Sequence, residues 1–405
     1  MRGRRRIAVH HVVRPGGGRR PPRAVGRPLA WALLAIIVGA VLTACQAGGS
    51  EEVPSTTSIG ANQEALAWTE HPLPDGMDAV TLASAGDALV VGAWATERPN
   101  PRLLVLRGGN LTEADVDGVT PYAAVARWLA VAARDGQLVA VGGARGGAHA
   151  NVRWTVWAGD LGREPPRLVE QPQPFGVFGG WGAGDLTGIA FAGTEPVVAG
   201  AWQSSRTGND VSLWFRSGDR WERQDSTGSP LGSTPRVLNG ARFVTSTGDG
   251  LALAGSVTDL GTGSIASVPA LWTAPGAHGP WTLVRLPASQ PIAEAHAARC
   301  DRDTCLVVGA DGGTLALWEV RGPTVARVPT PAIDVAEKQT LPPPVRVRGV
   351  DLVVVPGAVL QRGSSGWLQR SAPPGVPIAS ATVDDSLYVA TSDGEGRGRL
   401  WSARP

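Results

Sequence analysis

The sequence predicts an all-β fold, a seven-bladed β-propeller closed by a strand from the N-terminal end of the domain. Three observations lead to this prediction. Short β-rich runs repeat seven times between Leu89 and Leu387, at a period of about 50 residues. Tryptophans recur at fixed places within the repeat, and the last repeat lacks a final strand that an N-terminal segment can supply.

Each repeat contains runs that are typical of neighbouring strands in one sheet. The first recognisable run usually holds a glycine, as in LVVGAW (89–94) and VVAGAW (197–202), and the next resembles SLWFRSGD (212–219). A further run, such as WTLVRLP (281–287), often ends at proline. Strands of four to eight residues separated by turn dipeptides at a long fixed period favour four-stranded blades that bury both faces by stacking around a ring. Six or eight blades remain alternatives, because units two to four contain long insertions.

The end of the chain predicts how the ring closes. The seventh unit ends at Pro405 with GRLWSARP (398–405), a third-strand run, and has no fourth. Residues 66–74, LAWTEHPLP, match the fourth-strand pattern. We therefore expect one β-propeller domain over residues 66–405.

The tryptophans are expected to pack between blades rather than to bind a ligand, because recurrence in register indicates a shared structural role. One set falls in the third strand and one in the fourth: Trp157, Trp214, Trp272, Trp318 and Trp401, then Trp68, Trp221, Trp281 and Trp367.

The N-terminus predicts export. Nine arginines and no acidic residue precede an apolar run, Pro28 to Leu42, that ends in Leu42-Thr43-Ala44-Cys45. This order is typical of a signal peptide, here residues 1–44. The last four residues resemble the lipobox of bacterial lipoproteins, which implies lipidation of Cys45, a flexible tether over 45–65 and a place on the extracytoplasmic face of the cell membrane. A plain secretory signal and an uncleaved single-pass anchor are the alternatives.

Removal of the signal changes the charge. Nine of the 37 basic residues precede Cys45, which leaves 28 against 35 acidic residues, a net charge of −7. An acidic domain is a poor match for nucleic acid. We expect a monomer that is attached to the membrane through its lipid.

Cys300 and Cys305 are the cysteines that remain, and in an oxidising compartment an even pair predicts a disulfide. A metal site would need more ligands than the nearby His296, and a redox-active pair is more often spaced C-x-x-C. The disulfide would close the hairpin between the first two strands of the fifth blade.

Loop lengths indicate which side of the ring binds. In a propeller, the connections from the second to the third strand and from one blade to the next share one face, here called the loop face. The remaining turns share the opposite turn face. The loop face holds the long segments, which are 95–102, 143–153, 171–185, 203–210 and 256–268. Long connections often carry binding residues, and the candidates are Trp94, Phe175, Phe178, Trp181 and Trp202, with capping of the rim as the alternative role.

The sequence holds no recognisable catalytic set, metal-ligand spacing or cofactor motif, so none of these is predicted. The turn Ser217-Gly218-Asp219-Arg220-Trp221 resembles a shortened Asp-box of sialidase-like propellers, and the degenerate repeats are also weakly similar to those of WD-repeat propellers. These resemblances imply architecture only. Glu294 and His296 lie on an inner strand, where alternation would place both on one side, facing the central channel.

These observations predict a membrane-anchored extracytoplasmic lipoprotein whose propeller is a binding or scaffold module for an envelope protein or a glycan. The alternative is an extracytoplasmic carbohydrate-active hydrolase or lyase, which would need two carboxyl groups in one pocket.

Overall fold

The computed structural model describes residues 65–147, 151–261 and 263–405. The chain divides into two compact units, residues 1–60 and 61–405, and the described residues all belong to the second. The predicted signal peptide, Cys45 and the tether up to residue 64 lie outside the described residues. Within these described ranges, no helix is long and apolar enough to cross a membrane.

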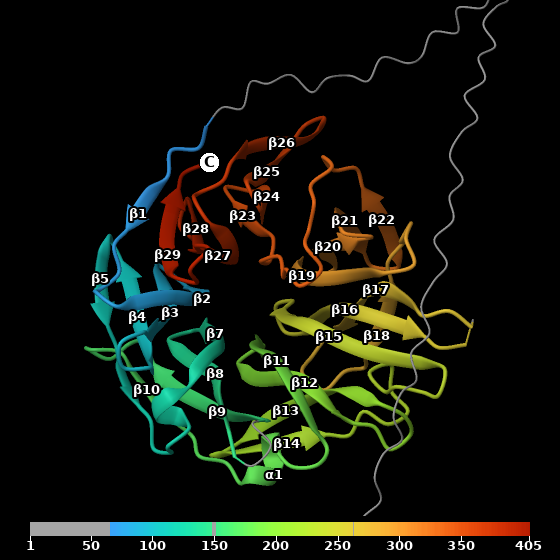
Figure 1. Ribbon diagram of the computed structural model, residues 1–405, viewed down its shortest axis with the longest axis horizontal. Coiled ribbons are helices and arrows are strands. Elements are labelled where there is room, and N and C mark those ends of the chain that lie inside the picture. The colour runs from blue at the N-terminus through green and yellow to red at the C-terminus, as the bar shows by residue number, and fades with distance from the viewer. Residues whose placement is uncertain (1–64, 148–150, 262) are drawn as a thin grey trace, which may run out of the picture. The chain divides into compact units, whose positions relative to one another are not determined.

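Seven sheets are arranged in a ring, each with its first four strands antiparallel and its first strand next to the central axis (Figure 1). Successive strands of a blade are joined by hairpins and lie progressively further from the axis. The prediction of a seven-bladed β-propeller is confirmed, and the counts of six and eight were wrong.

The first four blades contain the following strands, in chain order. Blade 1 is β2 (Met77–Ala85), β3 (Ala88–Ala95), β4 (Asn100–Arg107) and β5 (Asn110–Glu113). Blade 2 is β7 (Arg127–Arg134), β8 (Gln137–Gly146), β9 (Asn151–Asp160) and β10 (Arg167–Glu170), with β6 (Asp115–Asp117) on its outer edge. Blade 3 is β11 (Ala183–Ala192), β12 (Glu195–Gln203), β13 (Asn209–Ser217) and β14 (Arg220–Gln224). Blade 4 is β15 (Val237–Ser246), β16 (Leu251–Asp259), β17 (Ala266–Ala274) and β18 (Thr282–Arg285).

Three blades complete the ring. Blade 5 is β19 (Ala293–Asp301), β20 (Thr304–Asp311), β21 (Thr314–Arg321) and β22 (Thr324–Val328). Blade 6 is β23 (Val345–Val347), β24 (Val350–Val355), β25 (Ala358–Gly363) and β26 (Gly366–Ser371). Blade 7 is β27 (Val376–Val383), β28 (Ser386–Ser392), β29 (Gly398–Ala403) and β1 (Thr69–His71). A 3-10 helix, η1 (Ala123–Val125), and a short α-helix, α1 (Phe175–Phe178), lie in two connections between blades.

The N-terminal strand closes the ring as predicted. β1 pairs antiparallel with β29, with Thr69 opposite Ser402 and His71 opposite Leu400. The paired part is shorter than the expected 66–74. Trp68 instead packs between blades 6 and 7 and donates its indole N–H to the Ser371 carbonyl at 3.0 Å. Closure therefore combines backbone pairing with side-chain packing between the two ends of the domain.

Blade 2 has a fifth strand that the sequence analysis did not predict. β6 pairs in parallel with β10, with Val116 opposite Leu168. Three residues in a connection between blades show no alternation long enough to indicate a strand. The consequence is that the segment leading from blade 1 to blade 2 is fastened to the outer edge of blade 2.

A recurring bulge explains the glycine in the repeat. In six of the seven blades, the register between first and second strand shifts near the loop-face end. In five of these the second strand has glycine at this level. A Cβ on Gly255 or Gly309 would lie 2.0 Å from the carbonyl oxygen of Gly240 or Glu294 on the first strand. The glycine allows the bulged first strand to approach closely.

The hydrophobic core is divided among the junctions between blades. Seven clusters of buried side chains are found, one at each junction between adjacent blades. The third-strand tryptophans are buried, and four of them lie in four successive clusters: Trp157, Trp214, Trp272 and Trp318. The prediction that the third-strand tryptophans pack between blades is confirmed for these four.

Three of these tryptophans also hold the connection that arrives from the preceding blade. The indole N–H groups of Trp214, Trp272 and Trp318 donate to the carbonyl oxygens of Val177, Pro230 and Pro287, at 2.8, 2.9 and 2.7 Å. Each carbonyl belongs to the connection that enters the blade containing the tryptophan. A buried indole thus satisfies its own donor and positions a loop on the loop face.

Cys300 and Cys305 form a disulfide, and they lie opposite one another in the β19–β20 hairpin. The two-residue turn is Arg302-Asp303, since β19 ends at Asp301 and β20 begins at Thr304. The flanking Arg299 and Asp301 connect this hairpin to blade 6 through ion pairs with Asp351 and Arg346. The disulfide therefore closes a hairpin that is also held electrostatically to its neighbour.

Replacement of Trp272 by alanine is expected to lower the free energy of unfolding by about 3–5 kcal/mol. The substitution leaves a cavity between blades 3 and 4, and the Pro230 carbonyl oxygen loses its hydrogen-bond donor. The measurement is chemical denaturation followed by circular dichroism. Trp181→Ala is the matched control, since this ring is 97% exposed and its loss should leave stability within about 0.5 kcal/mol. Equal effects of the two substitutions would contradict this assignment of the core.

Candidate binding site on the loop face

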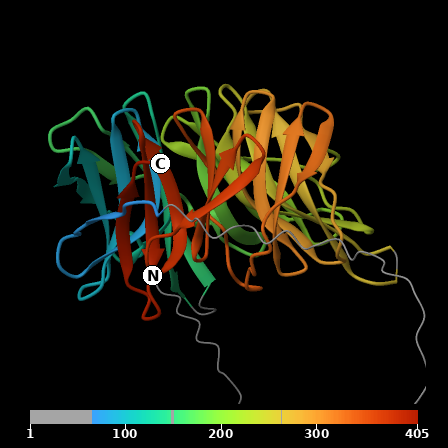
Figure 2. The same cartoon turned by 90° about the horizontal axis from the view of Figure 1, so that it is seen from above.

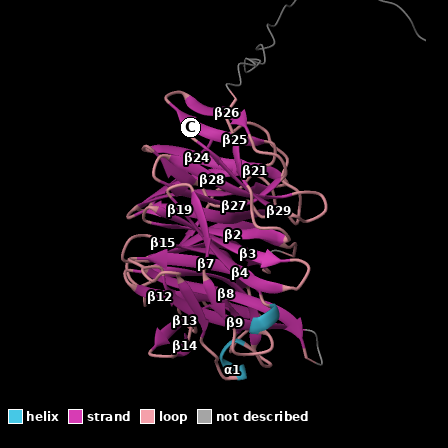
Figure 3. Cartoon of the chain, turned by 90° about the vertical axis from the view of Figure 1, so that its left-hand side faces the viewer, coloured by secondary structure: helices cyan, strands magenta, loops and turns pink. Residues whose placement is uncertain are grey.

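The two faces of the ring differ in their connections. Seen from the side, the strands of every blade run between them (Figures 2 and 3). On the turn face, the turn between first and second strand has two residues in six of the seven blades. On the loop face, connections such as 118–126, 171–182, 225–236 and 329–344 are much longer. The expected asymmetry is present, although strand pairing extends into several segments that were expected to be loop, leaving 96–99 and 204–208 unpaired.

Exposed apolar side chains gather on the loop face. Ten large apolar side chains are exposed among the described residues, and eight of them lie in or beside loop-face connections. The eight are Val119, Val125, Phe175, Trp181, Leu260, Ile265, Ile292 and Val376. The other two are Leu368, on the outer strand of blade 6, and Ile378, which lines the central channel. Such an uneven distribution is typical of a face that contacts another molecule.

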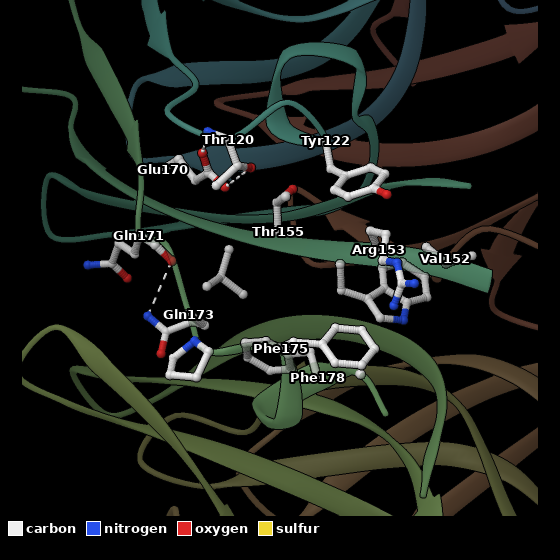
Figure 4. A pocket seen from close by; sticks show the side chains of 14 residues that line it. Thr120, Tyr122, Val152, Arg153, Thr155, Glu170, Gln171, Gln173, Phe175 and Phe178 are labelled. Carbon is white, nitrogen blue, oxygen red and sulfur yellow. Dashed lines mark hydrogen bonds between the residues drawn. The ribbon is translucent and has the colours of Figure 1, made fainter. Parts of the chain in front are cut away.

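A pocket of about 330 Å³ opens on this face above blade 2 (Figure 4). Its walls come from three segments: the 118–126 connection, the start of β9 and the 171–182 connection. The helical segments of the two connections, both cyan in Figure 3, lie close together at this edge of the ring. Four exposed apolar residues belong to the same two connections: Val119, Val125, Phe175 and Trp181.

One wall of the pocket is fixed by a buried carboxylate. Glu170, at the end of β10, accepts hydrogen bonds from the backbone N–H groups of Val119 and Thr120, at 2.7 and 2.6 Å. Its other oxygen accepts from the Thr120 hydroxyl at 2.7 Å. Both carboxylate oxygens are therefore used to hold the 118–126 connection in place.

The opposite wall is fixed by packing beneath α1. Phe178 is buried against Trp214 and Trp221, with ring centroids 5.5 and 6.4 Å apart. Gln171 and Gln173 accept hydrogen bonds from the indole and backbone N–H groups of Trp221. These contacts leave Phe175 at the surface, where it lines the pocket. The pocket is thus preformed by the fold.

An arginine lies at one end of the pocket. Arg153 is half-buried, and its guanidinium carbon lies 4.4 Å from the centroid of the Phe175 ring and 6.0 Å from that of Tyr122. Figure 4 shows it beside these two rings, with Glu170 and Thr120 on the other side of the cavity. Stacking on aromatic faces holds a guanidinium in place while leaving its N–H edge able to donate.

The predicted binding residues have different surroundings. Phe175 and Phe178 line the pocket, the first exposed and the second buried, and Trp181 projects into solvent. Trp202 packs edge-to-face on Trp214 at 6.1 Å and lies beneath Arg223.

Trp94, at the matching position in blade 1, packs under Arg127 and does not line the pocket. The structure therefore brings Phe175 and Phe178 together at one cavity, whereas the half-buried Trp94 and Trp202 are mainly packing residues of the rim.

Several pocket residues were missed by sequence reasoning. Thr120, Tyr122, Arg153 and Glu170 belong to three segments that are far apart in sequence, and no spacing relates them. The connection 118–126 was not counted among the long loops, because its neighbour β6 could not be recognised. Tyr122 is one of two tyrosines in the chain, which is the one signal that could have drawn attention to this segment.

The inner-strand pair Glu294 and His296 does not form a site open to the channel. The β19 bulge falls between Ala295 and Ala297, so the expected alternation fails at His296 itself. His296 is 4% exposed, and its Nδ1 accepts the backbone N–H of Leu341 at 3.3 Å. Glu294 pairs with Arg242 across the junction with blade 4. Among the described residues, no group of three potential metal ligands was found.

Known proteins provide no family assignment. No protein-family model and no curated protein matches the chain. The solved structures that it resembles include the WD40 domain of Neurospora crassa Pan2, with 14% identity over 84% of this chain and 96% of that chain at a TM-score of 0.45.

Two further resemblances are of the same kind. The β-propeller domain of the trilobed protease from Pyrococcus furiosus is 7% identical over 81% of this chain and 96% of that chain, with a TM-score of 0.48. YCF48 bound to D1 peptide is 12% identical over 84% and 97%, with a TM-score of 0.49. At this level of identity, the likeness concerns the fold alone.

His296 is expected to make stability depend on pH. Burial, with a contribution from the Arg242 charge, lowers the pKa of His296 from 6.5 to about 4. Its stabilising effect is complete above pH 6.5 and is lost as the pH falls towards 4, because the unfolded chain then binds a proton that the folded one does not. The cost reaches about 3 kcal/mol at pH 4.

His296→Asn keeps a hydrogen-bond acceptor for Leu341 and removes the titration. The difference in unfolding free energy between native protein and variant should therefore change between pH 6.5 and 4, at most by about 1.4 kcal/mol per pH unit. Urea denaturation at a series of pH values measures it. A difference that is constant across this range would contradict the assignment.

Proposed function

We propose that the protein is a lipid-anchored extracytoplasmic binding module whose loop face docks on a protein of the cell envelope. The observation that carries this proposal is the distribution of exposed apolar side chains among the described residues, eight of ten on the loop face. Aromatic and aliphatic groups around a preformed pocket are the usual centre of a protein–protein interface.

The turn face is less suited to docking because it is dense in ion pairs. Arg299 and Arg346 both contact Asp301 and Asp351, and Arg348 pairs with Asp385 at 2.8 Å. Charged residues are depleted from the centres of interfaces, since their removal from water is costly. A partner would therefore gain more by covering the loop face.

The residues that line the two cavities favour a binding function over hydrolysis. Glycoside hydrolysis requires two carboxyl groups at one pocket. Glu170 is the only carboxylate among the described residues that line the pocket above blade 2, and both its oxygens hold the backbone. The described lining of the central channel, about 580 Å³, contains no carboxylate.

The membrane attachment rests on the N-terminal sequence. Replacement of Cys45 by alanine is expected to move the protein from the membrane pellet to the soluble fraction and to abolish labelling by a radioactive fatty acid. Fractionation of cells that express the chain with its own signal peptide measures both. Cys300→Ala/Cys305→Ala is the matched control, since it replaces the other two cysteines of the chain and should leave attachment unchanged.

A soluble, unlabelled native protein would indicate a plain secretory signal. A Cys45→Ala variant that stays in the membrane would indicate an uncleaved anchor. Either result would contradict the lipid anchor.

Docking is tested by site-specific photocrosslinking in cells. A benzophenone amino acid at position 181 or 125 should crosslink to a protein of defined mass, and one at position 368, on the outer strand of blade 6, should not. Trp181→Ala should weaken binding of that partner by about tenfold or more, as for an interfacial tryptophan. Leu368→Ala, an exposed apolar residue off this face, should have no effect.

Other outcomes would overturn the proposal. A product of twice the chain's mass would make the loop face a self-association surface. No protein product at 181 or 125, together with binding of purified envelope glycan, would make the ligand a glycan.

A further inference from the structure

We propose that the pocket above blade 2 receives a segment of the partner protein that places an apolar or aromatic side chain next to a carboxylate. The apolar group would enter the cavity, and the carboxylate would pair with Arg153. This inference rests on the proposed function only in taking the partner to be a protein.

The cavity is suited to an apolar group. Its apolar and aromatic lining residues include Tyr122, Val152, Val156, Phe175 and Phe178. Phe175 is 58% exposed, so a bound side chain would cover a ring that now contacts water. A volume of about 330 Å³ lies at the lower end of the range of ligand pockets. Burial of such apolar surface provides binding free energy without requiring a particular orientation of the bound side chain.

Arg153 is the reason to expect a charged group on the ligand as well as an apolar one. Among the described residues, Arg153 lies against the Phe175 and Tyr122 rings and forms no ion pair with a carboxylate. Glu170 is the other charged residue that lines the pocket, and it is committed to Val119 and Thr120. The cavity therefore has one half-buried cation that pairs with none of the described carboxylates, since Glu170 lies on the other side of the cavity (Figure 4).

An anionic group on the ligand would supply the missing partner. A guanidinium that is already held by aromatic stacking loses little freedom when it binds a carboxylate, and its planar edge suits bidentate pairing. A carboxylate adjoining the apolar group is consistent with the arrangement of Arg153 at the end of an apolar cavity. A neutral or cationic ligand would leave this charge desolvated and unpaired.

A protein segment fits better than a free small acid because the apolar surface continues beyond the pocket. Val119 and Val125 are exposed on one wall-forming connection and Trp181 on the other. A small acid would leave these side chains in water, whereas residues on either side of an anchoring side chain could cover them. This is the usual arrangement of an anchor residue and its surroundings in an interface.

The experiment compares matched pairs of probes by ligand-observed NMR titration of the full-length protein in detergent. One pair is N-acetylphenylalanine and N-acetylphenylalanine amide, which differ in the terminal carboxylate. The other is N-acetyl-Phe-Asp-amide and N-acetyl-Phe-Asn-amide, which differ in a side-chain carboxylate. In at least one pair the acid should bind about tenfold more tightly than its neutral counterpart, and the pair that shows it distinguishes a chain terminus from an acidic side chain.

Three variants assign the effect to the pocket. Arg153→Gln should make acid and neutral probe bind equally, and Arg153→Lys should keep part of the difference. Phe175→Ala should weaken both members of a pair. Arg206→Gln, a loop-face arginine that does not line the pocket, is the control and should change nothing.

The inference is overturned if neither acid is preferred, if the preference survives Arg153→Gln in a variant with native circular dichroism, or if no probe binds at millimolar concentration. Any of these results combined with crosslinking at position 181 would leave the docking function intact. Loss of crosslinking at positions 181 and 125 with an Arg153-dependent preference would instead indicate a pocket for small acids.

Discussion

The structure depends on the buried tryptophan at the junction between blades. In blades 3, 4 and 5, this ring fills the core of the junction, and its N–H fixes the connection that enters the blade. Trp214 is the case with a functional consequence. By packing against Phe178 and donating to Val177, it places α1 so that Phe175 faces the pocket. One interaction therefore joins two blades and shapes the candidate site.

The division between the two faces follows from the same architecture. On the turn face, the short turns extend only a few atoms beyond the strand ends. Charged residues in and beside these turns form ion pairs between neighbouring blades. The longer loop-face connections extend beyond the strands and keep apolar side chains at the surface. Buried polar anchors such as Glu170, and Asp311 under Ser289 and Gln290, hold these connections without using apolar burial. Rigid loops with exposed apolar groups are well suited to recognition.

Much of the fold could be predicted from the sequence, because the same strand pattern recurs in each repeat and every copy supports the prediction made from the others. Seven units, tryptophans in register and a missing final strand each pointed to the same ring, and the Cys300–Cys305 hairpin fitted one blade. The candidate site was harder to predict from the sequence. Phe175 and Phe178 could be singled out within one segment, but Tyr122, Arg153 and Glu170 meet them only when three segments fold over blade 2. His296 shows the limit of alternation, because a bulge falls on that residue.

By itself the sequence determined the period, the closure of the ring, the disulfide and the buried role of the tryptophans, since these depend on local pattern and on repetition. The tertiary structure alone decided which exposed side chains share a face, which carboxylate holds backbone groups, and which arginine lies at the end of the pocket. The physical reason is that strand patterns arise from contacts within one blade, which recur along the chain. A pocket arises from connections of different length and origin, whose meeting point is set by the closed ring.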